Sequence, residues 1–85
     1  MVEIIDGIKF IVKQSSCIER HLPCGDKLIH FTAQYYDSSG RFVAQGGSPA
    51  NKRSARSHAR RSLFEKFGSH AKGKLNPEKL SKLGK

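Results

Sequence analysis

The fold is decided by the stretch LIHFTAQYYDSSGRFVAQ, which spans residues 28–45. Residues 28–36 alternate between apolar and more polar side chains, as expected of a half-buried strand. Residues 37–40 read Asp-Ser-Ser-Gly, a turn cluster whose glycine accepts a positive φ, and residues 41–45 form the return strand. The pattern predicts an antiparallel β-hairpin. The predicted core face of its first strand carries Ile29, Phe31, Ala33 and Tyr35.

A further strand is predicted before this hairpin. Residues 8–14 are rich in β-branched and aromatic side chains, and they follow the turn signal Asp6-Gly7. Residues 2–5 can pair across that turn as a short hairpin arm. Residues 15–27 show no clear pattern, so no element is predicted there.

One strong helix signal runs from Asn51 to Phe67. Asn51 suits the N-cap position, because its side chain can accept a hydrogen bond from an unpaired N–H of the first turn. Gly68 is a natural end for the helix. An apolar stripe recurs every fourth residue, and its small alanines allow close packing on the sheet. The stripe consists of Ala55, Ala59, Leu63 and Phe67.

Together these elements predict an α+β fold, in which a three-stranded antiparallel sheet packs against one long C-terminal helix. The predicted domain spans residues 1–68. Residues 69–85 are predicted to be a basic, mobile tail. Within this tail, Asn76-Pro77-Glu78 can begin a short helix, because proline suits the first helical turn.

The basic charge is concentrated in the last 35 residues. Residues 1–50 carry five Lys or Arg and five Asp or Glu, whereas residues 51–85 carry eleven and two, so the net charge of +9 arises entirely in the second part. A one-sided positive field attracts polyanions, of which nucleic acid is the commonest. We therefore expect a nucleic-acid-binding protein.

The basic residues of the helix form one patch rather than a ring. At ~100° per residue, four of them fall within an arc of about 100°. They are Lys52, Arg53, Arg56 and Arg60. We expect the helix to overhang the sheet at its start, so that these side chains reach phosphates, with Arg61 in support. Lysines of the tail would add non-specific attraction: Lys72, Lys74, Lys79 and Lys82.

Residues 31–67 resemble the C-terminal part of a double-stranded RNA-binding domain. The resemblance lies in a Phe-Thr-Ala-Gln strand beginning at Phe31, a Gly46-Gly47-Ser48 turn, and the helix element Lys52-Arg53-x-Ala55-Arg56. In that family the helix element grips phosphates across the major groove of A-form RNA. The resemblance thus implies this role for Lys52, Arg53 and Arg56, and it favours RNA over DNA.

The chain departs from that family in its first part. The family begins with an amphipathic helix, whereas residues 1–20 here have strand character. The family's second contact is a Gly-Pro-x-His loop. Lys27 stands where its histidine would be, and Asp26 beside it repels phosphate. Lys27 is therefore a sixth candidate contact.

Two other functions are compatible with the same residues. A three-stranded sheet can lay one face in the major groove of DNA, and here that face would carry Lys9 or Lys13 with Gln34, Tyr36 and Arg41. A basic helix can also dock on an acidic protein partner, for example as a small inhibitor. The hairpin aromatics Tyr35, Tyr36 and Phe42 are expected to be core residues or to form cross-strand pairs rather than to stack on bases.

Enzymatic and membrane functions are not expected. A chain of 85 residues has a small core with little room for a deep cleft, so we expect no catalysis and no cofactor. No run approaches the ~20 apolar residues of a membrane helix, and no signal peptide is recognisable, so we expect a cytoplasmic location. Four potential zinc ligands lie close together, but their spacing matches no common finger, and no metal is expected. They are Cys17, His21, Cys24 and His30.

Overall fold

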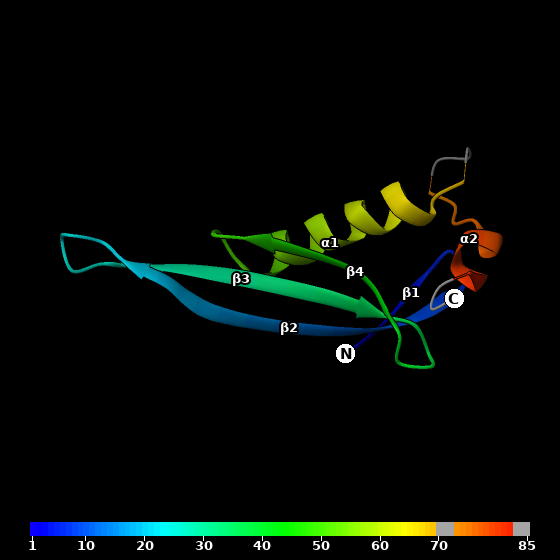
Figure 1. Cartoon of the computed structure of the whole chain (residues 1–85), viewed down its shortest axis with the longest axis horizontal. Coiled ribbons are helices and arrows are strands. Elements are labelled where there is room, and N and C mark those ends of the chain that lie inside the picture. Colours follow the sequence, from blue (N-terminus) through cyan, green and yellow to red (C-terminus); the bar gives the residue numbers. More distant parts are fainter. Residues whose placement is uncertain (70–72, 83–85) are drawn as a thin grey trace.

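The computed structural model describes residues 1–69 and 73–82, apart from the side chains of residues 19–21. Within them, four antiparallel strands form one sheet in chain order: β1 (Val2–Ile5), β2 (Ile8–His21), β3 (Lys27–Tyr36) and β4 (Phe42–Ser48). The long helix α1 (Lys52–Phe67) lies across one face of the sheet, and the short helix α2 (Pro77–Ser81) lies beside β1 (Figure 1). The α+β class, with an antiparallel sheet and one main helix, is confirmed.

The sheet has four strands rather than the expected three, because residues 2–5 form a full edge strand. Asp6 and Gly7 have φ angles of 52° and 75°. Two positive φ values are typical of the two-residue type I′ turn, whose twist matches that of a hairpin. All four residues of β1 pair with β2, and Ile5 is buried in the core.

β2 continues well beyond residue 14, where the predicted strand ended. It pairs with β3 as far as His21, with an irregularity between Ile18 and Arg20. Neither β1 nor β4 reaches residues 17–30, so this part of the hairpin pairs only with itself. We call residues 17–30 the β-arm. It projects past the start of α1 and lengthens the molecule to 49 Å, against 25 and 22 Å in the other directions (Figure 1).

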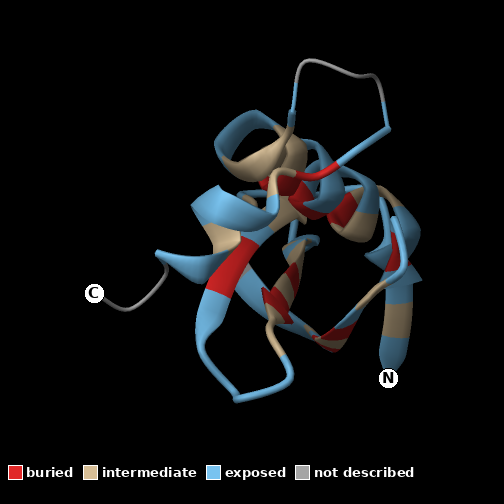
Figure 2. Cartoon of the chain, turned by 90° about the vertical axis from the view of Figure 1, so that its right-hand side faces the viewer, coloured by how far each residue is buried: buried red, intermediate tan, exposed pale blue. Residues whose placement is uncertain are grey.

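The core lies between α1 and one face of the sheet, and buried and exposed positions alternate along the strands (Figure 2). The predicted core face of β3 is confirmed for Ala33 and Tyr35, while Phe31 is partly buried at the margin. Ile29 is 42% exposed. The alternation predicted its face correctly, but α1 begins too late along the sheet to cover it.

The alanine stripe allows α1 to lie very close to β4. Ala55, Ala59 and Leu63 are fully buried, and Phe67 packs against the core. At Gly46 of β4, a Cβ atom would overlap the backbone of Ala59. Glycine is therefore required where the strand and the helix approach each other. The predicted packing of the stripe on the sheet is confirmed.

The segment after α1 is tied to the domain, in contrast to the mobile tail that its composition suggested. Leu75 is buried in the core, and its N–H donates to the Asp6 carboxylate at 2.9 Å. Gly68 ends α1 with an extended backbone and bridges Leu75. The predicted short helix is present as α2, with Asn76 as its N-cap. Residues 70–72 and 83–85 of the expected tail lie outside the described residues.

Neither α1 nor α2 is long and apolar enough to cross a bilayer, which holds for the described part of the chain.

Candidate nucleic-acid interface

The start of α1 is fixed above the middle of the sheet. Asn51 caps the helix, and its Oδ1 accepts the N–H of Ser54 at 2.8 Å, as predicted. The amide of Gln14 on β2 donates to the Lys52 carbonyl oxygen at 3.1 Å. On the other side of α1, Nδ1 of His58 donates to the Gly47 carbonyl of β4 at 2.8 Å. These contacts set the rotation of α1 and hence the direction of its cations.

The expected overhang of the helix is reversed. The sheet extends past α1, because the β-arm continues beyond the level of Gln14, where α1 begins. The first turn of α1, which carries Lys52 and Arg53, therefore lies on one face of the sheet next to the start of the β-arm (Figure 1).

Three of the predicted contacts on α1 are available to a ligand. Lys52, Arg53 and Arg61 are exposed. The first turn of α1 holds no acidic residue, and no ion pair formed by described residues includes any of the three. Two of the predicted contacts therefore lie together at the helix start, and Arg61 stands farther along.

Arg56 and Arg60 are partly engaged by the protein itself. The Arg56 guanidinium lies 3.6 Å from the Met1 sulfur. The Nη1 atom of Arg60 lies 3.7 Å from the Glu3 carboxylate, which also accepts the hydroxyl hydrogen of buried Tyr35. Burial and this hydrogen bond to Glu3 raise the pKa of Tyr35, so the hydroxyl remains a donor at neutral pH. Arg60 thus bridges α1 and β1 in addition to any contact with a ligand.

Lys27 is not brought together with the cations of α1. It begins β3 opposite His21, seven residues along β2 from Gln14. At about 3.3 Å per residue this separation is roughly 23 Å. Lys27 is exposed at the far end of the β-arm.

The face of the sheet opposite α1 holds most residues of the alternative DNA-binding surface. The register sets Lys13 opposite Gln34, and Tyr36 lies on the same face. The Lys13 ammonium lies 5.0 Å from the centroid of the Tyr36 ring. Arg41 is held by the Asp37 carboxylate at 3.0 Å in the β3–β4 turn. Tyr36 packs edge-on against Phe42 at 6.0 Å, which confirms the expected cross-strand pair.

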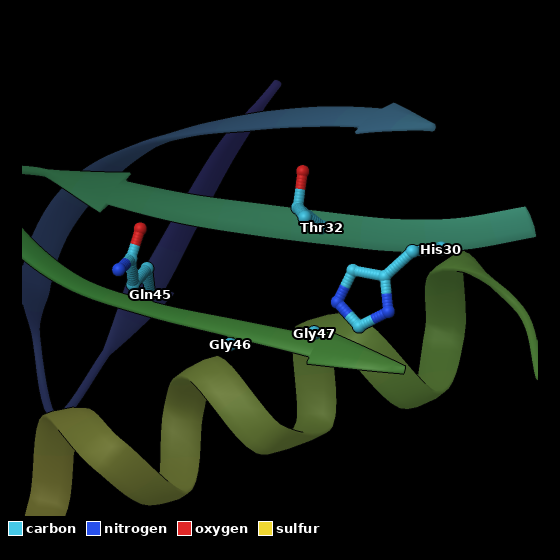
Figure 3. Close-up of a pocket in the computed structure, with 5 residues that line it drawn as sticks. All are labelled: His30, Thr32, Gln45, Gly46 and Gly47. Atoms are coloured by element: carbon cyan, nitrogen blue, oxygen red, sulfur yellow. The ribbon is translucent and has the colours of Figure 1, made fainter. Parts of the chain in front are cut away.

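A shallow polar pocket of about 330 Å³ lies on this same face, between β3 and β4. Its floor is the backbone of Gly46 and Gly47, and the His30 imidazole reaches across from β3 over Gly47 (Figure 3). A Cβ atom at Gly47 would overlap that ring. Thr32 and Gln45 complete the lining. The pocket lies on the other side of the sheet from the cations of α1.

The four potential zinc ligands are spread along the β-arm. Cys17 pairs with His30 across the two strands, while Cys24 lies in the turn with its sulfur 3.3 Å from the Asp26 carboxylate. Among the described side chains, no three potential ligands meet. The His21 side chain lies outside the described residues.

Sequence reasoning missed two features of this surface. The first is the β-arm, although the sequence does signal it: Pro23 to Asp26 form a turn cluster, in which Gly25 has a φ of 91°. If this cluster is taken as a hairpin turn, β2 and β3 are expected to extend as far as it. The bridge from Arg60 to Glu3 has no sequence signal, because the two residues lie 57 positions apart.

Comparison of the chain with protein-family models, with curated proteins and with solved structures finds no significant match. The charge, register and exposure of its own residues therefore indicate what this surface can bind.

Proposed function

We propose that the protein binds double-stranded nucleic acid, RNA in preference to DNA, through phosphate contacts made by the first turns of α1. Lys52, Arg53 and Arg56 are the principal contacts, with Arg60 and Arg61 in support. The observation that carries the proposal is the exposure of Lys52 and Arg53, without a carboxylate partner among the described residues, on a domain whose first 50 residues are neutral.

The electrostatics of α1 support an anionic ligand. The N-terminus of a helix carries a partial positive charge, so cations in the first turn are unfavourable for the free helix. α1 has none of the acidic residues that would offset this charge there. A phosphate near Lys52 and Arg53 relieves the conflict, and release of condensed counterions from the duplex drives binding.

The preference for RNA rests on the resemblance of residues 52–56 to the phosphate-gripping element of double-stranded RNA-binding domains. Phosphate contacts position a protein without reading sequence, so we expect recognition of duplex geometry. The activity is binding rather than catalysis and needs no cofactor. We place it in the cytoplasm.

DNA binding through the open face of the sheet is a second candidate function. It is favoured by the alignment of Lys13, Gln34 and Tyr36 on one face. Lys9 and Lys13 would then make the phosphate contacts, and α1 would face away from the duplex. The two modes differ in which lysines matter, and this makes them separable.

The test is a set of anisotropy titrations with duplex RNA, duplex DNA and single strands of the same sequence at several salt concentrations. The triple variant Lys52→Ala, Arg53→Ala, Arg56→Ala should weaken RNA binding and lower the slope of log K against log salt by about 2–3, at roughly 0.9 per lost phosphate contact. The control is Lys9→Ala with Lys13→Ala, which removes exposed cations from the other face and should leave RNA binding nearly unchanged.

Two results would overturn the proposal. A larger loss in the Lys9 and Lys13 control would favour the DNA-binding face. The second result is that the wild type binds no nucleic acid with a dissociation constant below ~10 μM at modest salt, a value already typical of non-specific binding. This result would favour an acidic protein partner.

A further inference from the structure

The outer edge of β2 is left unpaired beyond Val12. Val12 exchanges backbone hydrogen bonds with Met1, donating its N–H at 2.8 Å and accepting from the Met1 amino group at 3.4 Å. Because a strand repeats every two residues, the backbone groups of Gln14, Ser16 and Ile18 face the same side. Among the described residues, no backbone group bonds to them there. A sheet edge of this kind can pair with a further strand.

This edge lacks the features that usually protect an edge strand. Charged side chains, prolines or a covering element normally keep such edges from pairing with other strands. Residues 14–18 read Gln-Ser-Ser-Cys-Ile and contain neither a charge nor a proline, although the whole chain has a net charge of +9. No described element lies along the edge (Figure 1). The edge is therefore open to a strand from a partner.

The middle of this edge is apolar. Ile18 and Ile29 are directly opposite each other on β2 and β3, and they are 51% and 42% exposed. They share the face of the sheet that α1 covers, but α1 begins only at the level of Gln14. Exposed apolar side chains that adjoin one another mark a surface for a protein partner. An open edge and an apolar pair thus coincide at one point of the β-arm.

We propose that a second copy of this chain pairs its β2 antiparallel along this edge, about a two-fold axis at Ile18. A two-fold interface uses the same patch on both copies. Ile18 then faces Ile18 of the second copy, and the two isoleucines of each copy form one apolar cluster. The inference goes beyond the proposed function and does not rest on it.

The position of the axis follows from the space along the edge. The second copy must fit its own turn, residues 22–26, beside β2 without meeting Met1, which occupies the edge at Val12. Pairing about Ile18 sets residue 22 of the second copy level with residue 14, beyond Met1. Pairing about Ser16 would set the same turn level with residue 10, where β1 already lies. Ile18 is therefore the axis that the structure permits.

Charge complementarity favours a second copy as the occupant. Asp26 is exposed in the turn of the β-arm, where its carbonyl accepts the N–H of Leu22 at 2.7 Å. With Leu22 of the second copy level with Gln14, its Asp26 lies about two strand spacings away, roughly 10 Å. Lys52, whose carbonyl accepts from Gln14, is within reach of that carboxylate. This exposed pair contributes little, so Lys52 remains available to phosphate.

The same pairing keeps like charges apart. Lys52 lies four residues from the axis in each copy, so the two lysines are separated by roughly 26 Å along the strands. Lys27 lies two residues beyond Ile29, on an outer strand of the paired sheet, so its two copies are roughly 20 Å apart. Both separations exceed the Debye length of about 8 Å at physiological ionic strength. The net positive charge of the chain does not prevent pairing.

A second copy is also favoured over an unstructured peptide. An unstructured peptide must be ordered before it can add a strand, and this lowers its affinity. The edge of a second copy is already extended, because β3 holds it as far as His21. No such ordering is needed when two copies pair.

The test measures self-association of the full chain by sedimentation velocity, without nucleic acid. A reducing agent is present, because Cys17 and Cys24 are free and exposed. The informative variants are Ile18→Lys and Ile18→Glu, which place a charge on the axis. The control is Ile4→Lys, which adds the same charge as the first variant at a 70% exposed residue of β1, on the other face. Thermal unfolding checks that each variant is folded.

The wild type should form a weak dimer, with a dissociation constant on the order of 100 μM, because the interface is small. Ile18→Lys should weaken it about tenfold or more, since two ammonium groups would stand on residues about 5.5 Å apart. Ile4→Lys should associate as the wild type does. An equimolar mixture of Ile18→Lys and Ile18→Glu should pair about as tightly as the wild type, because opposite charges then meet on the axis.

Reversal of the charge in the turn gives a second measurement that leaves Ile18 unchanged. Asp26→Lys should weaken the dimer about fivefold, the upper end for an exposed ion pair, because it faces Lys52 of the second copy. Glu65→Lys is the matched control, since Glu65 lies near the other end of α1 and should not affect pairing. This comparison decides the matter if the Ile18 variants do not fold.

A wild type that stays monomeric at ~1 mM, well above the expected dissociation constant, would overturn the inference. Equal weakening by Ile18→Lys and Ile4→Lys would also overturn it, because the contact would not be confined to the β-arm. A mixture of the two Ile18 variants that pairs no better than its components would show that the axis lies elsewhere. None of these results bears on phosphate binding by α1, which the nucleic-acid titrations decide separately.

Discussion

Tyr35, buried under α1, donates its hydroxyl hydrogen to the carboxylate of Glu3 on the edge strand β1. The hydrogen bond passes across the full width of β2 and joins the centre of the sheet to its edge. Arg60 of α1 reaches the same carboxylate. Three elements that are far apart in sequence thus meet at one acidic side chain.

Replacing Tyr35 by Phe should lower the free energy of unfolding by about 1–2 kcal/mol, because a partly buried carboxylate loses its hydrogen-bond donor. Urea unfolding followed by circular dichroism measures the change. Tyr36→Phe is the control, since this ring lies on the open face and should change stability by less than about 0.5 kcal/mol. Equal effects of the two substitutions would contradict a special role for Tyr35.

Arg60→Ala should weaken nucleic-acid binding less than Arg53→Ala, because Arg60 is already paired with Glu3. We expect losses of about twofold for Arg60 and about 5–10-fold for Arg53, the latter corresponding to one phosphate contact near 0.1 M salt. Anisotropy titrations on duplex RNA measure both. If Arg60 proves the more important of the two, its bridge to Glu3 must open when the ligand binds.

Gly46→Ala should destabilise the fold by about 1–3 kcal/mol, as expected of overpacking, because the added methyl group meets the backbone of Ala59. Thermal unfolding measures the effect. Gln45→Ala, at the exposed position before it, should be nearly neutral. A neutral Gly46→Ala would mean that α1 can move away from β4 without loss.

Acid should loosen the contact between Asp6 and the segment at Leu75. The backbone N–H of Leu75 holds the pKa of Asp6 below its usual value, with a further contribution from Lys74. A carboxylate whose pKa is lower in the folded state stabilises the fold above its unfolded pKa, near 3.9, and this stabilisation is lost as the pH falls through the folded value. Stability of the wild type should therefore fall more steeply below pH 4 than that of Asp6→Asn.

Urea unfolding of both proteins at pH 7 and at about pH 2.5 would test this dependence. Asparagine tolerates the positive φ of Asp6 and keeps an acceptor for Leu75, so the two proteins differ mainly in charge. Their difference in stability should shrink in acid. A constant difference across this range would show that the Asp6 charge does not contribute.

The predicted elements are those whose signals are local. The hairpin of residues 28–45 and the stripe through Ala55, Ala59 and Leu63 follow from the spacing of apolar residues, and the structure has both. The extension of β2 was missed because Ser15, Ser16 and Cys17 interrupt the apolar pattern, while backbone pairing with β3 continues regardless. Hydrogen bonding between strands does not need apolar side chains.

The candidate site was predictable only in part for the same reason. The exposure of Lys52 and Arg53 follows from the position of the N-cap. The engagement of Arg60, the distance of Lys27 from α1, and the exposure of Ile29 depend on where α1 begins over the sheet. That position is set by contacts such as Gln14 with Lys52, which join distant parts of the chain.

The hydrogen bond from Leu75 to Asp6 closes a loop of 69 residues. Native contacts of such long sequence separation form late, because the entropy of closing the loop must first be overcome. During synthesis, the β1–β2 turn emerges from the ribosome long before Leu75 does. The hairpins and α1 can assemble in the meantime, but the core remains open at one end until Leu75 has been added.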